Sequence, residues 1–157
     1  MRILDFIKKE VIPDHIICPC FYYQVPLEYE QEICMDFPRA RRFVLDENAY
    51  DMGQLPVPIQ QAWNGGNISY VEEYVSLKAL YEQGGIVLKP SMRASLNLKR
   101  LRLNRIFFGF ENQEEITSGC FGAVKGHYVI KALLDSYETD HVFNKMFCPL
   151  GERIRDF

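Results

Sequence analysis

Six basic side chains lie between Lys89 and Arg105, and no acidic residue interrupts them. They are Lys89, Arg93, Lys99, Arg100, Arg102 and Arg105. Ammonium and guanidinium groups bind phosphate oxygens, so this stretch is a candidate contact for phosphate or for an anionic membrane surface. The other interpretation is a solvated helix face or loop, which is what most runs of charge are.

Other reactive residue types show no spacing that indicates a nucleophile or a metal site. The five cysteines contain no CxxC pair, and Cys18 and Cys20 are too close for an easy disulfide and lack a second pair of zinc ligands. We therefore expect reduced, mostly buried thiols. His15 and His141 have no partner at a useful spacing. His127 follows a turn glycine and is expected to begin a helix with a local hydrogen bond, with a catalytic base as the alternative.

The composition favours one globular domain spanning residues 1–157. The chain has 157 residues, of which 48% are apolar and 13% aromatic, and this is enough for a sizeable core. A net charge of -3 gives no reason to expect nucleic acid as a partner. No GxSxG, HExxH or P-loop pattern occurs, so hydrolase and nucleoside-triphosphatase activities have no direct support.

The sequence also bears on location. Lys8, Lys9 and Glu10 interrupt the apolar stretch at the N-terminus, so we expect no signal peptide. No run approaches the roughly 20 apolar residues that a membrane-spanning helix needs. We expect a soluble, cytoplasmic protein without a transmembrane segment, which can make peripheral contact with the inner face of the membrane.

The first half of the chain alternates short helices and strands. Met1–Glu10 has the pattern of a short amphipathic helix. A buried strand is expected within His15–Tyr23, a helix over Leu27–Phe37 and a second strand over Arg41–Leu45. Pro56 and Pro58 are expected to exclude regular structure until about Ile59.

The most informative local pattern is a helix, a Gly-Gly pair and a buried strand in direct succession. Apolar residues recur at helical spacing from Ser69 to Tyr81, and Ser69 with Glu72 is predicted to form a capping box. Gly84-Gly85 ends the helix, because glycine adopts the left-handed conformation of a C-cap. Ile86–Leu88 follows as a short apolar strand.

The second half continues the alternation. Strands are expected over Ile106–Phe110 and Gly119–Val124, separated by a polar loop, and a helix over Tyr128–Tyr137. Alternating helices and short apolar strands predict an α/β layer architecture with a mainly parallel sheet flanked by helices.

Several segments resemble those of a known family. Tyr74–Leu88 (YVSLKALYEQGGIVL) is similar to a stretch in which an Arg-Leu-Asp helix leads to Tyr-x-x-Gly-Gly-Ile-Tyr-Leu-Asp-x-Asp. Phe107–Asn112 (FFGFEN) resembles Phe-x-Gly-Phe-Glu-Asn, and Ser118–His127 (SGCFGAVKGH) resembles Gly-x-x-Gly-Ala-x-x-Gly-His. Ile12-Pro13, followed by an apolar strand, resembles its opening Ile-Pro-Lys-Ile-Ile-His, and Leu45–Asp51 (LDENAYD) stands where the family has a Trp-Asn-Glu-Asp type turn. The family is glycosyltransferase family 32, the DXD-type sugar transferases, which include bacterial capsular polysaccharide enzymes and fungal initiating mannosyltransferases.

The resemblance covers about residues 11–137 and implies a GT-A-like nucleotide-sugar fold, with the donor at the carboxyl ends of the strands. In active members, the aspartates of Asp-x-Asp hold Mg²⁺ or Mn²⁺ against the donor diphosphate. Here Lys89 and Ser91 stand at those positions, so the DXD motif is degenerate. Ser76-Leu77-Lys78 replaces Arg-Leu-Asp, and Glu72-Glu73 replaces an upstream Ser-Asp. We therefore expect no metal cofactor.

The resemblance also implies which residues face each substrate. The donor side would be lined by Tyr74, Lys78, Gly84, Gly85, Lys89 and Ser91. The acceptor side would include Glu111, Asn112 and Gly119, because a carboxylate beside an amide suits a polyol. Glu114 and Glu115 are candidates for the base of an inverting transfer or else solvent-exposed side chains, and no catalytic residue is assigned.

Two functions follow. In the first, Lys89 and Lys78 replace the metal, and the protein transfers a sugar from a nucleotide-sugar donor to a glycan or lipid-linked acceptor during surface polysaccharide biosynthesis. In the second, the site has decayed and the protein is a pseudoenzyme that acts as a binding module or partner subunit. The loss of several family residues together favours the second, so whether the chain is an enzyme stays open.

Overall fold

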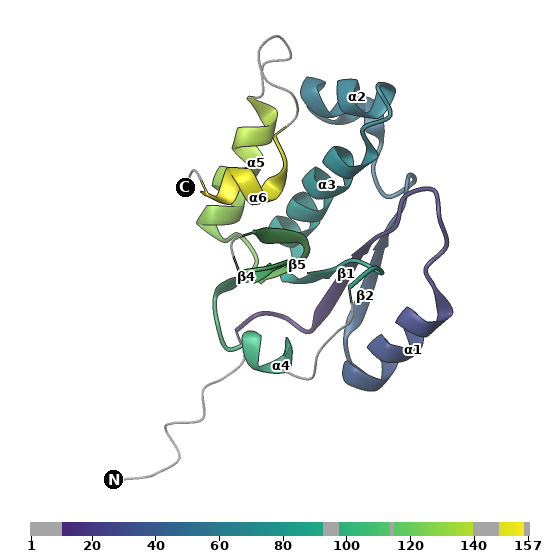
Figure 1. The fold of residues 1–157 in the computed structure, drawn as a ribbon, viewed down its shortest axis with the longest axis vertical. Helices are drawn as coiled ribbons and strands as arrows, with labels where there is room; N and C mark the ends of the chain where they lie inside the picture. The colour runs from purple at the N-terminus through teal and green to yellow at the C-terminus, as the bar shows by residue number, and fades with distance from the viewer. Residues whose placement is uncertain (1–10, 93–97, 114, 140–147, 156–157) are drawn as a thin grey trace.

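The computed structural model describes residues 11–92, 98–113, 115–139 and 148–155. Its centre is a five-stranded sheet in the order β2-β1-β3-β5-β4 (Figure 1). β1 (His15–Pro19) pairs in parallel with β2 (Arg41–Leu45) and with β3 (Gly85–Leu88). β5 (Ile116–Ala123) pairs antiparallel with β3 and with β4 (Ile106–Phe110).

The α/β class is therefore as predicted, but the sheet is mixed rather than mainly parallel. Two of its four strand pairings are antiparallel, and both involve β5. The connection between β4 and β5 is short, and the amide of Glu111 donates to the carbonyl of Glu115 across it at 2.8 Å. A connection of this length joins antiparallel neighbours, because a parallel crossover needs a dozen or more residues.

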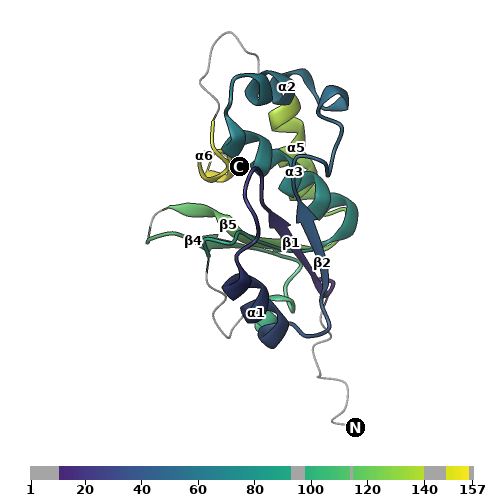
Figure 2. The same cartoon turned by 90° about the vertical axis from the view of Figure 1, so that its right-hand side faces the viewer.

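Helices cover both faces of the sheet. On one face lie α2 (Val57–Asn64), α3 (Ile68–Gln83), α5 (Tyr128–Glu138) and α6 (Leu150–Arg155), and on the other lie α1 (Leu27–Asp36) and α4 (Leu98–Leu101) (Figures 1 and 2). Each face has its own hydrophobic core. Every residue of α3 from Tyr70 to Leu77 is buried, because α2, α5 and the sheet surround this helix. Its apolar residues therefore occur on all sides instead of one.

Several elements begin or end at other residues than expected. Asn67, not Ser69, caps α3, because its side chain accepts a hydrogen bond from the amide of Tyr70 at 3.4 Å. A helix begins at Val57 despite the prolines, since Pro58 lies in its first turn, where no intrahelical donor is lost. β1 ends at Pro19, before the aromatic residues that were predicted to continue it. The helix predicted over Met1–Glu10 lies outside the described residues.

Other expectations hold. α1, β2 and β4 lie within a residue of the predicted ranges. His127 begins α5, where its Nδ1 accepts a hydrogen bond from the amide of Val129 at 3.2 Å. Within the described ranges, no helix is long and apolar enough to cross a membrane.

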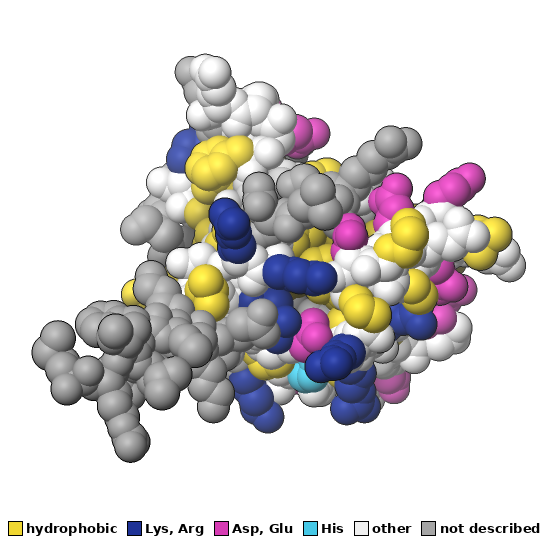
Figure 3. All heavy atoms as spheres, turned by 90° about the horizontal axis from the view of Figure 1, so that it is seen from below, with side chains coloured by type: hydrophobic (Ala, Val, Ile, Leu, Met, Phe, Trp, Pro, Cys, Tyr) yellow, Lys and Arg dark blue, Asp and Glu magenta, His cyan; other side chains and the backbone are white. Residues whose placement is uncertain are grey.

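The basic stretch does not act as one surface. Arg102 is buried, and its guanidinium lies 3.3 Å from Oδ1 of Asp14 and donates to the carbonyl of Ile12 at 3.1 Å. It therefore ties α4 to the segment before β1. Lys99, Arg100 and Arg105 are exposed. Figure 3 shows several Lys and Arg side chains across the underside of the molecule, with acidic side chains beside them.

Candidate functional site

The candidate site lies where the carboxyl ends of β1 and β3 meet. The two strands are parallel neighbours, with Ile16 opposite Ile86 and Ile17 opposite Val87. β2, the strand that follows β1 in the sequence, lies on one side of β1, and β3 lies on its other side. The direction in which strands are added to the sheet therefore reverses between β1 and β3. Open α/β sheets bind ligands at such a reversal. The residues after Pro19 and after Leu88 are therefore brought to one edge.

Lys89, the first residue after β3, forms an ion pair with Glu72 of α3. The distance from Nζ to Oε2 is 3.4 Å, and the exposed fractions of the two side chains are 15% and 10%. The other carboxylate oxygen of Glu72 accepts from the amide of Phe21 at 3.4 Å, just beyond β1. Glu72 thus links the ends of both strands and compensates the charge of Lys89, so the pair is neutral as a unit.

Ser91 and Gly119 adjoin Lys89. Ser91 is exposed within a turn that the amide of Met92 closes onto the carbonyl of Lys89 at 2.9 Å. The carbonyl of Gly119 accepts from the amide of Lys89 at 2.9 Å. A Cβ on Gly119 would lie 2.7 Å from Cγ of Met92, so a side chain at this position would displace the turn.

The residues at this edge do not fit a divalent cation. Glu72 offers the carboxylate nearest to Lys89, and it already pairs with an ammonium group. Among the residues that the structure describes, no group of three or more His, Cys, Asp or Glu side chains is arranged to hold a metal ion. A hard cation needs several converging oxygen ligands, and the other carboxylate at this edge, that of Glu47, accepts a hydrogen bond from the amide of Tyr22 at 3.4 Å.

Two aromatic residues that the sequence analysis did not assign to the site project at the same edge. Tyr22 has a φ of 62°, a left-handed conformation that is strained for a residue with a side chain. Its ring is stacked on that of Trp63, with 5.4 Å between centroids and 19° between planes. The side chain of Tyr22 is 63% exposed, so one face of the pair is open to a ligand. The run Phe21-Tyr22-Tyr23 directly after an apolar strand is the sequence signal that could have identified it.

Tyr74 and Lys78 lie on another face of α3. The hydroxyl of Tyr74 donates to Oε1 of Glu138 at 3.0 Å, and burial together with this carboxylate raises the pKa of Tyr74. Lys78 pairs with Glu82 at 2.9 Å and lies 5.8 Å from the ring centre of Tyr50. Glu72 and Lys78 are six positions apart on a helix of 3.6 residues per turn, so they point in different directions. The structure does not bring Lys78 together with Lys89.

Gly84 and Gly85 lie at the opposite end of β3 from Lys89. Gly84 is the C-cap of α3 with a φ of 69°, and Gly85 has a φ of 132°. A Cβ on Gly85 would lie 2.7 Å from Cβ of His15. These glycines allow the turn and the close approach of β3 to β1.

Of the three predicted acceptor residues, Glu111 lines a separate cleft of roughly 260 Å³, whereas Asn112 and Gly119 are not among the residues that line it. Its walls are Glu73, Glu111, Glu115, Ile116, Ser118, Pro149, Gly151, Glu152 and Arg155. Asn112 is held by the loop itself, because its Nδ2 donates to Oε2 of Glu115 at 2.7 Å and its Oδ1 accepts from the amide of Glu115 at 3.0 Å. Glu114 lies outside the described residues.

A buried polar network fixes α6 as one wall of this cleft. Glu73 accepts from the hydroxyl of Tyr137 at 2.8 Å and from the amide of Leu150 at 3.0 Å. The guanidinium of Arg153 lies 3.8 Å from the ring centre of Tyr137 and donates to the hydroxyl of Tyr70 at 3.1 Å. The segment that contains α6 had no assigned function at the sequence level, because its partners are 77 and 83 residues away.

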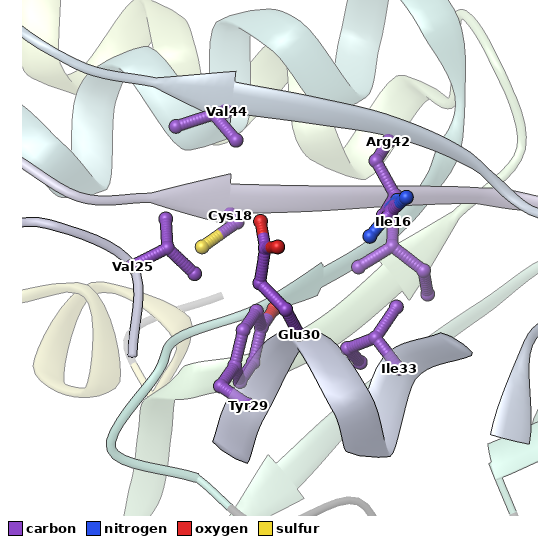
Figure 4. Close-up of a pocket in the computed structure, with 8 residues that line it drawn as sticks. All are labelled: Ile16, Cys18, Val25, Tyr29, Glu30, Ile33, Arg42 and Val44. Carbon is purple, nitrogen blue, oxygen red and sulfur yellow. The ribbon is translucent and has the colours of Figure 1, made fainter. Parts of the chain in front are cut away.

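A second, smaller cavity between α1 and the β1–β2 pair is not a ligand site. Figure 4 shows side chains of α1 facing those of the two strands across it, including Tyr29, Cys18 and Arg42. Its volume of about 20 Å³ has room for one water molecule. Burial raises the pKa of Cys18 to about 12, so this thiol is inert at neutral pH. Cys18 and Cys20 are buried, but Cys34 is exposed and Cys120 and Cys148 are half-buried, so fewer cysteines are buried than expected.

The comparisons with known proteins support the fold alone. The sequence matches no family model and no curated protein. Among solved structures, the chain is similar to one described as PaToxG glycosyltransferase, with a TM-score of 0.60 and 10% sequence identity. The similarity covers 89% of this chain and 64% of that one, so this chain spans less than two thirds of that protein. The protein therefore has a glycosyltransferase-like fold.

Proposed function

We propose that this chain binds a nucleotide sugar at the carboxyl edge of β1 and β3 and transfers the sugar without a divalent cation. The observation that supports this proposal is the ammonium group of Lys89, which Glu72 holds at the switch point of a glycosyltransferase-like sheet. As the sequence resemblance implies, the acceptor would be a glycan or a lipid-linked sugar of surface polysaccharide assembly.

Each part of the donor has a matching feature at this edge. The stacked pair of Tyr22 and Trp63 offers an exposed aromatic face to the base. The ammonium of Lys89 has three N–H donors, so it can keep its contact with Glu72 and donate to a phosphate oxygen as well. Ser91, exposed in the adjoining turn, can add a hydroxyl donor. Lys78, which pairs with Glu82, is not part of this arrangement.

The transfer step uses the cleft beside β5. The acceptor hydroxyl oxygen forms a bond to the anomeric carbon, while the bond from that carbon to the diphosphate oxygen breaks and the nucleotide diphosphate leaves. The hydroxyl proton passes to a carboxylate in the cleft, for which Glu111 and Glu115 are the candidates. Lys89 offsets the charge that develops on the diphosphate, which is the task of a metal in related enzymes.

One observation favours the alternative function, a non-catalytic binding or partner subunit. Glu72 already compensates Lys89, and Lys78 lies elsewhere, so the site offers a diphosphate less positive charge than two unpaired lysines would. A nucleotide diphosphate with two or three negative charges would then bind weakly, and the fold would serve to contact another molecule.

Isothermal titration calorimetry with UDP- and GDP-sugars, with and without Mn²⁺, tests the proposal. We expect binding that does not depend on Mn²⁺ and that is weakened about 10- to 100-fold in Lys89→Ala, because a hydrogen bond to a charged group is lost. Lys78→Ala is the matched control, since this lysine lies on another face of α3, and it should bind as the wild type does.

The outcomes separate the two functions. Binding with release of free nucleotide diphosphate in the presence of an acceptor establishes the enzyme. Binding of no nucleotide sugar under either condition contradicts the proposal and leaves the partner-subunit function. Equal losses in Lys78→Ala and Lys89→Ala would contradict the placement of the donor.

A further inference from the structure

β4 is the strand at one margin of the sheet (Figures 1 and 2), and part of its backbone faces away from β5. The carbonyl of Arg105 accepts from the amide of Val124 at 2.9 Å, and the amide of Glu111 donates to the carbonyl of Glu115 at 2.8 Å. These two residues therefore direct backbone groups toward β5. Because hydrogen-bonding direction alternates along a strand, Ile106 and Phe108 direct theirs to the other side of β4, where no strand among the described residues pairs with it.

The strand itself has no charged residue or proline to keep other strands away, although it is only five residues long and its pairing with β5 is irregular. Ile106–Phe110 reads IFFGF, with no charge and no proline, and Phe110 is 62% exposed. The other margin of the sheet differs, because β2 begins with the exposed residues Arg41 and Arg42. An apolar edge strand without such protection is a template for pairing with another strand.

The irregular register between β4 and β5 leaves the backbone of β4 extended. Between the pairs Phe108–Phe121 and Phe110–Ile116, β4 advances by two residues and β5 by five. The extra residues are therefore in β5, so β4 itself stays extended. An extended strand keeps its outward amides and carbonyls in line, which a partner strand needs.

The charges that flank β4 identify the partner that fits it. Arg105 precedes the apolar run and Glu111 follows it, and both are exposed. In an antiparallel pairing of β4 with a second β4, centred on Phe108, residue 105 of one copy lies opposite residue 111 of the other. Arginine then faces glutamate at both ends of the pair, and Ile106 faces Phe110 between them. The run Arg-Ile-Phe-Phe-Gly-Phe-Glu is complementary to itself.

We infer that the open edge of β4 is an interface for a second copy of this chain. The two sheets join about a twofold axis near Phe108 and form one continuous sheet. Two Arg105–Glu111 pairs, one at each end of the contact, lie at its rim. A twofold interface requires one surface to be complementary to itself, and the charges that flank β4 meet this requirement. This inference does not involve the proposed donor site, but it shares Glu111 with the proposed acceptor cleft, so its test measures association and not sugar transfer.

Sedimentation equilibrium of the full chain over a range of concentrations, with a charge-swap series, tests it. The wild type should form dimers. Arg105→Glu places Glu opposite Glu111 twice in each dimer, and Glu111→Arg places Arg opposite Arg105 twice, so each should raise the dissociation constant about tenfold. The double variant Arg105→Glu/Glu111→Arg restores both pairs and should dimerise as the wild type does.

Mixing the two single variants provides the sharpest control. An equimolar mixture of Arg105→Glu and Glu111→Arg should form heterodimers, because each copy supplies the charge that the other lacks. Far-UV circular dichroism should show that both exposed substitutions leave the fold intact. A wild type that is monomeric at all concentrations overturns the inference, and so does a dimer that neither single reversal weakens.

Discussion

At the residue scale, the main finding is that Lys89 does not act alone. The sequence has a lysine directly after the strand β3, and the structure adds Glu72 at 3.4 Å from it. Glu72 also accepts from the amide of Phe21, so the same carboxylate positions the lysine and the end of β1. The charge available to a ligand therefore depends on both residues.

Glu72→Gln should separate the hydrogen bond of this side chain to Phe21 from its charge opposite Lys89. The amide oxygen of Gln can still accept from Phe21, but the charge opposing Lys89 is gone. We expect the free energy of unfolding to fall by about 1–3 kcal/mol, since a largely buried ion pair is broken. We also expect tighter binding of a nucleotide diphosphate, because the ammonium is no longer compensated. Urea denaturation and calorimetry measure the two effects, and weaker binding in this variant would contradict the assigned place of the diphosphate.

At the element scale, the ends of the helices show how local chemistry decides structure. His127 caps α5 through a hydrogen bond that Nδ1 can accept only when this nitrogen carries no proton. Burial and the nearby charge of Arg105 lower the pKa of His127. The folded protein therefore holds this side chain neutral at a pH where the unfolded chain begins to protonate it.

Stability should consequently depend on pH through this cap. With a lowered pKa in the folded state, the contribution of His127 is complete above the unfolded pKa of about 6.5 and is lost as the pH falls below it. Asn is a strong N-cap that does not titrate, so His127→Asn should lose less stability than the wild type between about pH 7 and pH 5. Chemical denaturation at each pH measures this difference. Parallel curves for the two proteins would show that the cap does not titrate in this range.

At the scale of the whole molecule, the site exists because β1 and β3 are neighbours. Their contact requires a residue without a side chain at Gly85, since a Cβ there would lie 2.7 Å from Cβ and the carbonyl oxygen of His15. This contact at one end of the strands sets the register that brings the residues after Pro19 and Leu88 together at the other end.

Two glycines allow a controlled test of this contact. Gly85 and Gly66 both have positive φ, at 132° and 75°, but no atom lies within 4 Å of a Cβ built on Gly66. Gly66→Ala should cost only about 1 kcal/mol, which is the backbone strain alone. Gly85→Ala adds a collision with the neighbouring strand and should cost about 2–4 kcal/mol. Thermal unfolding of the two variants measures the difference, and equal losses would mean that the strands can move apart at little cost.

Much of the fold could be predicted from the sequence alone. The succession of α3, the Gly-Gly pair and β3, the range of β4, and the cap at His127 all depend on neighbours within a few residues, so local patterns carry them. The glycosyltransferase-like fold was implied by the resemblance of several segments to a known family, and a solved structure with this fold is similar to the chain. The capping box at Ser69 was wrong because Asn67, two residues earlier, offers a better acceptor.

The site itself was decided by the tertiary structure. From the sequence we predicted that Lys78 and Lys89 both line the donor side. Which way Lys78 points, however, depends on which face of α3 packs against the sheet. It could not assign Glu72 to Lys89, or place α6 at the wall of the cleft, because these contacts join residues 17 and 77 positions apart. The mixed sheet also depends on the tertiary structure. Whether β5 runs parallel or antiparallel to β3 is set by the path of the chain between them, which local sequence patterns do not show. The position of Lys89 directly after a buried strand could be predicted from the sequence, but its pairing with Glu72 was decided only by the packing of distant segments.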